Sequence, residues 1–193
     1  MKFYIHLPHK QIRMGNKTIM VNLFGGPGTG KSTSCAQIFT ELKWQGINCE
    51  MALEFAKDKV WEESLKVLEN QVYIFGKQFH RMKRLDGKVD VVITDSPLLF
   101  TLVYDNTKSI NFRNFVIDMH KGFNNVNVFL QREKPYVQSG RLQDENGAKE
   151  LDVRIRKMLD EVNETYITVK ANKDEISKIT LSVITKLNLE TGI

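Results

Sequence analysis

The feature that most restricts the fold of this chain is a loop that fits the pattern G-x-x-x-x-G-K-[ST] at every position: Gly25, Gly26, Pro27, Gly28, Thr29, Gly30, Lys31 and Ser32. Its glycines let the backbone curl until successive N–H groups converge, which is a geometry that binds phosphate oxygens. In this pattern the lysine reaches the β- and γ-phosphates and the hydroxyl ligates Mg²⁺. The loop, extended to Thr33, is therefore predicted to bind the phosphates of a nucleoside triphosphate.

The sequence on either side of the loop has the pattern that a phosphate-binding loop requires. Residues 18–24 form a short apolar run typical of a buried strand, and residues 31–45 place Ile38, Phe39 and Leu42 on one face of a helix. A helix that begins at the loop directs the positive end of its dipole toward an anion. The alternative, a glycine-rich turn with a purely structural role, does not account for this strand–loop–helix order.

Strand and helix patterns then alternate along the rest of the chain. Further strands are predicted over residues 47–53, 89–94, 127–130 and 166–169, and helical patterns over residues 60–85, 110–121, 146–163 and 174–187. Such alternation predicts an α/β fold, a P-loop NTPase three-layer sandwich with a five-stranded parallel sheet flanked by helices. We expect a basic segment over residues 1–17 and a single domain over residues 18–193, with a lid around residues 131–145.

Composition sets limits on the compartment and the partners. The 193 residues carry a formal net charge of +5, and residues 1–24 contain Lys2, Lys10, Arg13 and Lys17 but no acid. This segment is predicted to be a solvated leader, with an arm that contacts a polyanion as the alternative. No apolar run reaches the ~20 residues of a membrane span, and no signal peptide is evident. We therefore expect a cytoplasmic protein, in the host cytoplasm if phage-encoded, whose two cysteines are reduced and buried.

Two carboxylates are predicted to lie near the loop. Asp95 follows the apolar strand over residues 89–94, at the sheet edge where open α/β sheets bind ligands, and is the candidate second ligand of Mg²⁺ beside Ser32. Glu54 closes the preceding strand and is placed to accept a proton from an attacking hydroxyl. The alternatives are a turn cap for Asp95 and a helix N-cap for Glu54.

A third group of candidates lies in the predicted lid. The segment from residue 131 to residue 141 follows a strand, contains proline and glycine, and carries the cations Arg132, Lys134 and Arg141. Lids of phosphoryl transferases need cations to neutralise the charge that develops on the transferred group. Arg132 and Arg141 are the candidates for this task, and a solvated charged loop is the alternative.

Other classes of P-loop protein fit the sequence less well. A guanine-reading loop requires Asn-Lys-x-Asp, but residues 172–175 end in Glu175. A GTPase switch places glycine three residues after the magnesium aspartate, where this chain has Leu98. The chain also lacks the signature of transporter ATPases and is short for a ring ATPase with its lid domain. A small kinase is the class that remains.

Four segments, over residues 24–33, 54–57, 94–97 and 132–141, resemble the small P-loop kinases of bacteriophage genomes, which are related to nicotinamide riboside kinase-like and deoxynucleoside or nucleotide kinases. The resemblance spans about residues 18–187. It implies Mg²⁺-dependent transfer of the γ-phosphoryl group of ATP, with Asp95 serving Mg²⁺ or the acceptor and Glu54 facing the acceptor hydroxyl. One departure is Ser96-Pro97, because many deoxynucleoside kinases have Arg-Ser after the acidic residue.

The acceptor stays open between a free nucleoside, a nucleotide and 5-hydroxymethyluracil in phage DNA. Gln71 and Gln78 share a helical face and are candidates to read a base, although they are equally ordinary polar positions. Aromatic residues at 55, 61, 73 and 79 could stack on a base, but core positions are the commoner use of this spacing. A basic cluster over residues 77–88 could neutralise the phosphates of a DNA strand, or it could be a solvated face that also contacts nucleotide phosphates. A DNA-stimulated ATPase or regulator without a small acceptor is the alternative function, and a homodimer stays open.

Overall fold

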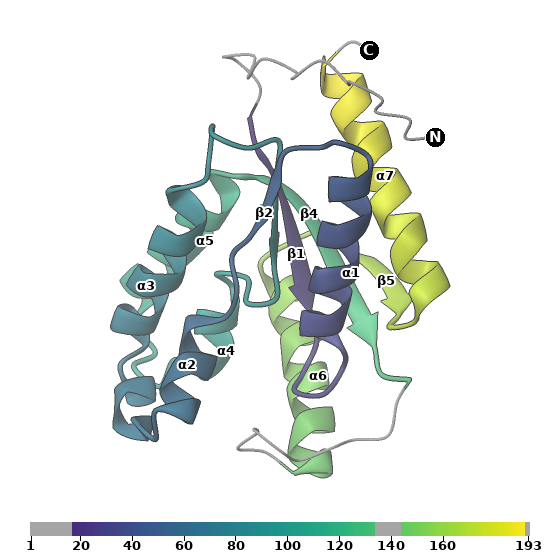
Figure 1. Cartoon of the computed structure of the whole chain (residues 1–193). Coiled ribbons are helices and arrows are strands. Elements are labelled where there is room, and N and C mark those ends of the chain that lie inside the picture. The colour runs from purple at the N-terminus through teal and green to yellow at the C-terminus, as the bar shows by residue number, and fades with distance from the viewer. Residues whose placement is uncertain (1–16, 134–143, 192–193) are drawn as a thin grey trace, which may run out of the picture.

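Five parallel strands form the centre of the computed structural model, which describes residues 17–133 and 144–191. Their order across the sheet is β2-β3-β1-β4-β5 (Figure 1). The strands are β1 (Ile19–Phe24), β2 (Cys49–Met51), β3 (Val91–Thr94), β4 (Asn124–Gln131) and β5 (Ile167–Lys170). Because β1 pairs with both β3 and β4, the phosphate-binding loop that follows β1 emerges at the middle of the carboxyl edge.

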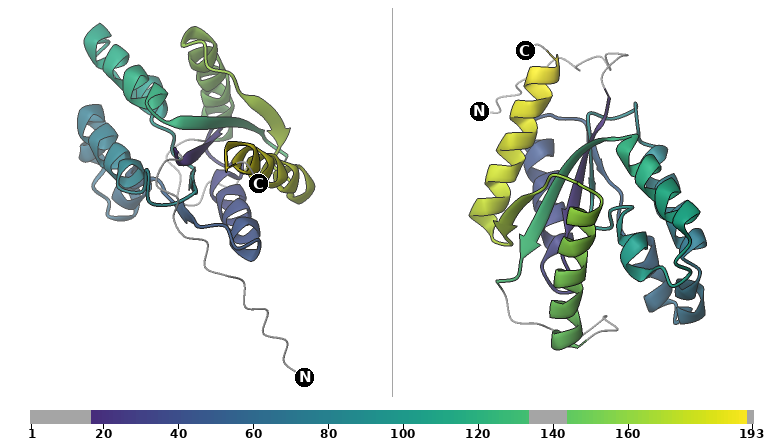
Figure 2. Two further views of the ribbon diagram at one scale, coloured as in Figure 1. Left: turned by 90° about the horizontal axis from the view of Figure 1, so that it is seen from above. Right: turned by 180° about the vertical axis from the view of Figure 1, so that it is seen from behind.

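Helices cover both faces of this sheet (Figure 2). One face packs against α1 (Lys31–Trp44) and α7 (Lys173–Thr191), and the other against α3 (Gln71–Lys83), α4 (Phe100–Tyr104), α5 (Ile110–Lys121) and α6 (Glu145–Glu161). The short helix α2 (Phe55–Trp61) and the 3₁₀ helix η1 (Leu65–Glu69) lie between β2 and α3 in the chain. The predicted α/β fold, a five-stranded parallel sheet between helical layers, is confirmed.

The two helical layers bury alternate residues of the same strands. On β1, Ile19, Val21 and Leu23 face α1 and α7, whereas Met20 and Phe24 face the opposite layer, and all five are fully buried. A strand with helices on both faces is therefore apolar at successive positions, which is why the run over residues 18–24 predicted β1 correctly. The two cysteines are buried and unpaired, as predicted, and burial raises the pKa of both thiols.

One polar residue interrupts this apolar strand. Asn22 lies in the middle of β1 and is fully buried, and its Nδ2 donates hydrogen bonds to Asn125 Oδ1 at 2.9 Å and Asn127 Oδ1 at 3.0 Å on β4. Asn127 Nδ2 in turn donates to Glu164 Oε2 at 2.9 Å, just beyond α6. This chain of amides links β1, β4 and the segment after α6 and satisfies the side-chain N–H groups of Asn22 and Asn127, whereas Asn22 Oδ1 has no partner among the described residues.

The single long helix predicted over residues 60–85 is wrong, because three shorter elements take its place. After α2 the backbone turns at Glu63, whose φ is 55°, and η1 ends at Glu69, just before Asn70. Asn70 then caps α3 by accepting a hydrogen bond from the Tyr73 N–H at 3.0 Å. The apolar spacing that suggested one helix belongs to elements that fold around a cavity. The second strand is also shorter than predicted, and α4 has no counterpart among the predicted helices.

Two of the predicted segments lie outside the described residues: residues 1–16 of the basic segment, and residues 134–143 of the lid, which include Lys134 and Arg141. In the part of the chain that the structure describes, no helix is long and apolar enough to cross a membrane.

The Asn70 cap gives a direct test of where α3 begins. Asn70→Ala removes the side-chain acceptor of the Tyr73 N–H and is expected to lower the free energy of unfolding by about 1 kcal/mol, whereas Asn70→Asp keeps the acceptor and most of the stability. Urea denaturation followed by circular dichroism measures both variants. An alanine variant as stable as the wild type would contradict the assigned helix start.

Candidate nucleotide-binding site

The loop after β1 has the nest-like backbone that its sequence predicts. Gly30 has φ 97° where α1 begins, and Gly25 has φ 140°, so both adopt conformations that side chains rarely allow. A Cβ on Gly25 would also lie 2.8 Å from Thr29 Oγ1, and that hydroxyl donates a hydrogen bond to Gly26 O across the turn. Glycine at these positions is therefore what lets the loop close in front of α1.

Lys31 lies over the loop itself. Its ammonium donates hydrogen bonds to Gly25 O at 2.7 Å and Gly26 O at 3.0 Å, so the charge is held against the backbone carbonyls at the start of the loop. Burial lowers the pKa of Lys31, while the carboxylates of Glu54, Asp95 and Asp152 oppose that change. The lysine thus lies among three carboxylates at the edge of the loop, and the negative oxygens of a triphosphate would stabilise the same charge.

Ser32 and Asp95 meet directly, although 63 positions and two strands separate them along the chain. Ser32 Oγ donates to Asp95 Oδ2 at 2.6 Å, and the backbone N–H of Glu54 donates to Asp95 Oδ1 at 3.0 Å. Both carboxylate oxygens therefore bond to other segments, which disfavours a turn cap as the main role of Asp95. The side chain is held at the carboxyl end of β3 by the register of β3 beside β1.

This pair of oxygens fits the ligand preference of Mg²⁺, which takes one or two protein oxygens and completes its shell with water and substrate phosphates. Ser32 Oγ and Asp95 Oδ2 would hold the ion beside the loop. Within residues 17–133 and 144–191, no group of three or more His, Cys, Asp or Glu side chains could hold a metal by itself. A magnesium ion here would therefore depend on the nucleotide for most of its ligands.

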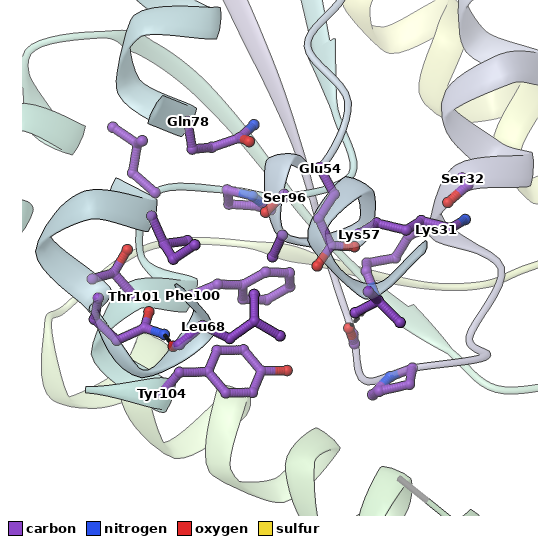
Figure 3. Close-up of a pocket in the computed structure, with 18 of the residues that line it drawn as sticks. Lys31, Ser32, Glu54, Lys57, Leu68, Gln78, Ser96, Phe100, Thr101 and Tyr104 are labelled. Atoms are coloured by element: carbon purple, nitrogen blue, oxygen red, sulfur yellow. Dashed lines mark hydrogen bonds between the residues drawn. The ribbon is translucent and has the colours of Figure 1, made fainter. Parts of the chain in front are cut away.

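Glu54 occupies the N-cap position of α2, but its side chain makes no capping hydrogen bond. Figure 3 shows the carboxylate directed toward Lys31 and Lys57. Burial raises the pKa of Glu54, which outweighs the opposite effect of Lys31, and Asp95 raises it further. Glu54 follows β2 by three residues and lies close enough to Lys31 for each charge to affect the pKa of the other.

A cavity of about 620 Å³ begins at the loop and continues past Glu54 between α2, η1, α3 and α4. Figure 3 shows Leu68, Phe100 and Tyr104 gathered on one side of it. The wall also includes Trp61 and Leu65, which are 66% and 45% exposed. The sequence singled out Trp61, Gln71 and Gln78 of this wall as candidates to contact a base, but it predicted one long helix where α2, η1 and α3 surround the chamber.

The loop is braced from the other side by two residues of distant elements. Arg132, just after β4, donates from Nη1 to Pro27 O at 2.7 Å and pairs through Nη2 with Asp152 Oδ2 at 3.0 Å. Asp152 on α6 accepts the Gly26 N–H through its other oxygen. Arg132 was predicted as a lid cation, and it lies at the loop. Asp152 was missed, since nothing distinguishes it from other polar positions of the amphipathic helix α6.

The candidate base-reading amides differ in what they contact. Gln78 is buried, and its Oε1 accepts the Phe55 N–H at 3.1 Å while its Nε2 lies within bonding distance of Ala52 O and Thr94 Oγ1. These contacts join α3 to β2, α2 and β3. Gln71 also lines the cavity, and its Nε2 donates to Leu68 O, whereas its Oε1 accepts no hydrogen bond from the described residues. Gln71 is therefore better placed than Gln78 to contact a ligand.

Two members of the basic cluster over residues 77–88 are engaged in ion pairs. Arg81 pairs with Asp58 at 2.5 Å, and Lys83 pairs with Asp86 at 2.7 Å. Internal partners thus reduce the positive charge that this surface would offer to a polyanion.

Alanine substitutions at two glycines test the contact between the loop and α6. A Cβ on Gly26 would lie 2.6 Å from Ala148 O and 2.8 Å from Asp152 Oδ1, so Gly26→Ala is expected to lower the free energy of unfolding by about 1–3 kcal/mol. Gly76→Ala, on the exposed face of α3 with no atom within 4 Å, is the matched control and should stabilise by about 0.5–1 kcal/mol. Equal unfolding midpoints for the two variants in urea would contradict this packing.

Three comparisons with known proteins show what this chain is similar to. No curated protein matches the chain by sequence. Among solved structures, thymidylate kinase from Ehrlichia chaffeensis is similar with a TM-score of 0.57, 12% identity, and coverage of 89% of this chain and 100% of that chain. Identity this low shows the fold alone, which is a P-loop NTPase kinase fold. A family model described as an AAA domain matches residues 20–175, the greater part of the sequence, and the chain therefore belongs to the AAA domain family.

Proposed function

We propose that this protein is an ATP-dependent phosphotransferase that moves the γ-phosphoryl group of ATP to an acceptor of nucleoside or nucleotide type. The observation that carries the proposal is the continuity of the cavity, which includes the phosphate-binding loop, Glu54 and a further chamber under α2 and η1. Hydrolysis of ATP requires space for water alone beyond the γ-phosphate. A chamber of this extent beside a buried carboxylate fits a second substrate.

On the donor side, the triphosphate would lie on the N–H groups of the loop, with Lys31 at its β- and γ-phosphates. Ser32 and Asp95 would hold Mg²⁺, which when bound supplies positive charge to the oxygens of the transferred group. Asp152 braces the loop through its bond to the Gly26 N–H, and Arg132 contacts the loop at Pro27 O. In this arrangement the loop binds the donor, ATP, and Glu54 lies on the side of the acceptor.

The transfer itself needs a base and an aligned acceptor. The acceptor oxygen forms a bond to the γ-phosphorus, the bond from that phosphorus to the β–γ bridging oxygen breaks, and ADP leaves with the electron pair. Glu54 would take the proton of the attacking hydroxyl. A carboxylate whose pKa is raised by burial holds that proton better than an exposed one, which favours this role.

The lid cations complete the proposal. Arg132 would neutralise charge on the transferred group, in which case its guanidinium would exchange the carbonyl of Pro27 for a phosphate oxygen. Arg141 has the same predicted role and lies outside the described residues. The similarity in fold to a thymidylate kinase supports a kinase reaction without identifying the acceptor.

Two alternatives from the sequence analysis are open to test: a DNA base as the acceptor, and ATP hydrolysis without an acceptor. A hydroxymethylated base in DNA offers the same kind of hydroxyl as a free nucleoside, but it would have to leave the base stack to enter the chamber. A regulator or DNA-stimulated ATPase would use the loop, Lys31 and Asp95 but leave the chamber under α2 without a substrate. The ion pairs of Arg81 and Lys83 favour a free acceptor over a DNA strand.

Lys31 tests the donor side. Lys31→Ala removes the ammonium from the loop and is expected to reduce ATP-dependent turnover by at least about 100-fold, because charge compensation at the phosphates is lost. Release of ADP in a coupled assay measures the effect. Lys43→Ala, at the far end of α1, is the control and should turn over ATP like the wild type. Retained activity in Lys31→Ala would overturn the phosphate-binding assignment.

Glu54 tests the acceptor side. Glu54→Gln should slow phosphoryl transfer by about 10²–10⁴-fold while leaving the affinity for ATP nearly unchanged, since the amide cannot accept the proton. Glu50→Gln, on the exposed side of β2, is the matched control. A loss of ATP binding in Glu54→Gln would remove Glu54 from this role.

The pH dependence follows from the direction of the pKa shift. A raised pKa means that Glu54 becomes protonated, and therefore inactive as a base, at a higher pH than an ordinary glutamate. The transfer rate should consequently fall as pH decreases, and this acidic limb should be absent from the residual rate of Glu54→Gln. An identical acidic limb in both proteins would assign it to another group.

A further inference from the structure

The acceptor part of the cavity carries little positive charge. Among the described residues that line the cavity, the cations are Lys31 and Lys57, and the anions are Glu54 and Glu69. Lys31 is bound to the loop, so Lys57 is the cation that remains for the acceptor part, beside Glu54 and Glu69. A phosphate group in this chamber would lie against Glu54, and phosphate sites ordinarily use bidentate arginine or several cations.

The arginine of α3 that lies nearest in sequence to the cavity wall does not supply that charge. Arg81 follows the lining residues Gln71, Ile74 and Gln78 along α3, but its Nη1 donates to Leu53 O at 3.0 Å and its Nη2 pairs with Asp58. Its guanidinium also stacks over the Phe55 ring at 5.2 Å. These contacts hold the charge on the outer side of α2 and α3.

The rest of the chamber suits a flat, uncharged molecule. Phe100 and Tyr104 contribute rings on one side, and Trp61 contributes a third ring that lines the cavity while 66% exposed. Gln71 and Asn106 add amides, which can pair with the edge of a heterocycle. An exposed tryptophan beside polar groups is a typical stacking platform for a base.

From these observations we infer that the acceptor is a nucleoside without a phosphate, so that the group phosphorylated is a hydroxyl. The inference rests on the proposed phosphotransferase function and narrows its acceptor. The base stacks on Trp61 near the mouth, and the sugar hydroxyl reaches Glu54. The hydroxyl oxygen bonds to the γ-phosphorus, its proton passes to Glu54, and ADP leaves with the electrons of the broken bond to the bridging oxygen.

The test compares each common ribo- and deoxynucleoside, and 5-hydroxymethyldeoxyuridine, with its own 5′-monophosphate. The sequence contains two tryptophans, and Trp44 lies outside the cavity at the end of α1, so Trp44→Phe leaves Trp61 as the single fluorescent reporter. Binding is followed by Trp61 emission, and transfer by label from [γ-³²P]ATP. Phosphorus NMR then distinguishes a phosphate monoester from a diphosphate.

At least one nucleoside should quench Trp61 and become a phosphate monoester, with kcat/KM about 100-fold above that of its monophosphate. Trp61→Ala should raise KM for that nucleoside about 10-fold with ATP affinity unchanged, and Trp61→Phe should restore most of the loss. Transfer to monophosphates in preference to nucleosides would overturn this inference and leave the proposed function standing. Transfer to none of these acceptors, nor to DNA containing 5-hydroxymethyluracil, with ATP still bound, would overturn both.

Discussion

The hydrogen bond from Ser32 to Asp95 joins the two strands on which the site depends. Ser32 begins α1 after the loop of β1, and Asp95 follows β3, so the bond exists because β1 and β3 lie side by side in parallel register. The second oxygen of Asp95 accepts the Glu54 N–H and thereby fixes the end of β2 as well. One carboxylate thus positions Ser32, the end of the loop and the proposed base relative to one another.

The surrounding structure restrains this arrangement from two directions. On the side of α6, Asp152 and Arg132 bind the backbone of Gly26 and Pro27, which keeps the loop from opening outward. On the side of α3, Gln78 bonds to the backbone of β2 and α2, which holds Glu54 at the entrance to the chamber. Such support is what a phosphoryl transferase needs, because its catalysis depends on positioning and fixed charge.

The sequence predicted β1, the loop and the start of α1 because their signals are local. The loop pattern and the apolar run of β1 follow from neighbouring residues, and so does the position of Asp95 at a strand end. The elements around the chamber were instead predicted as one helix, whereas residues 60–85 break into three elements, and the break depends on Glu63 and the Asn70 cap. The sequence also did not predict the role of Asp152 or the structural hydrogen bonds of Gln78, because both arise from contacts between elements distant in the chain.

The measurement that tests the account most directly is the fate of the γ-phosphoryl group. The wild-type protein is incubated with Mg²⁺, [γ-³²P]ATP and a mixture of free nucleosides, nucleotides and DNA containing 5-hydroxymethyluracil, and the label is divided between acceptors and inorganic phosphate. The account predicts that most of the label is found on an acceptor. Release of all label as inorganic phosphate, stimulated by DNA, would contradict it and identify an ATPase.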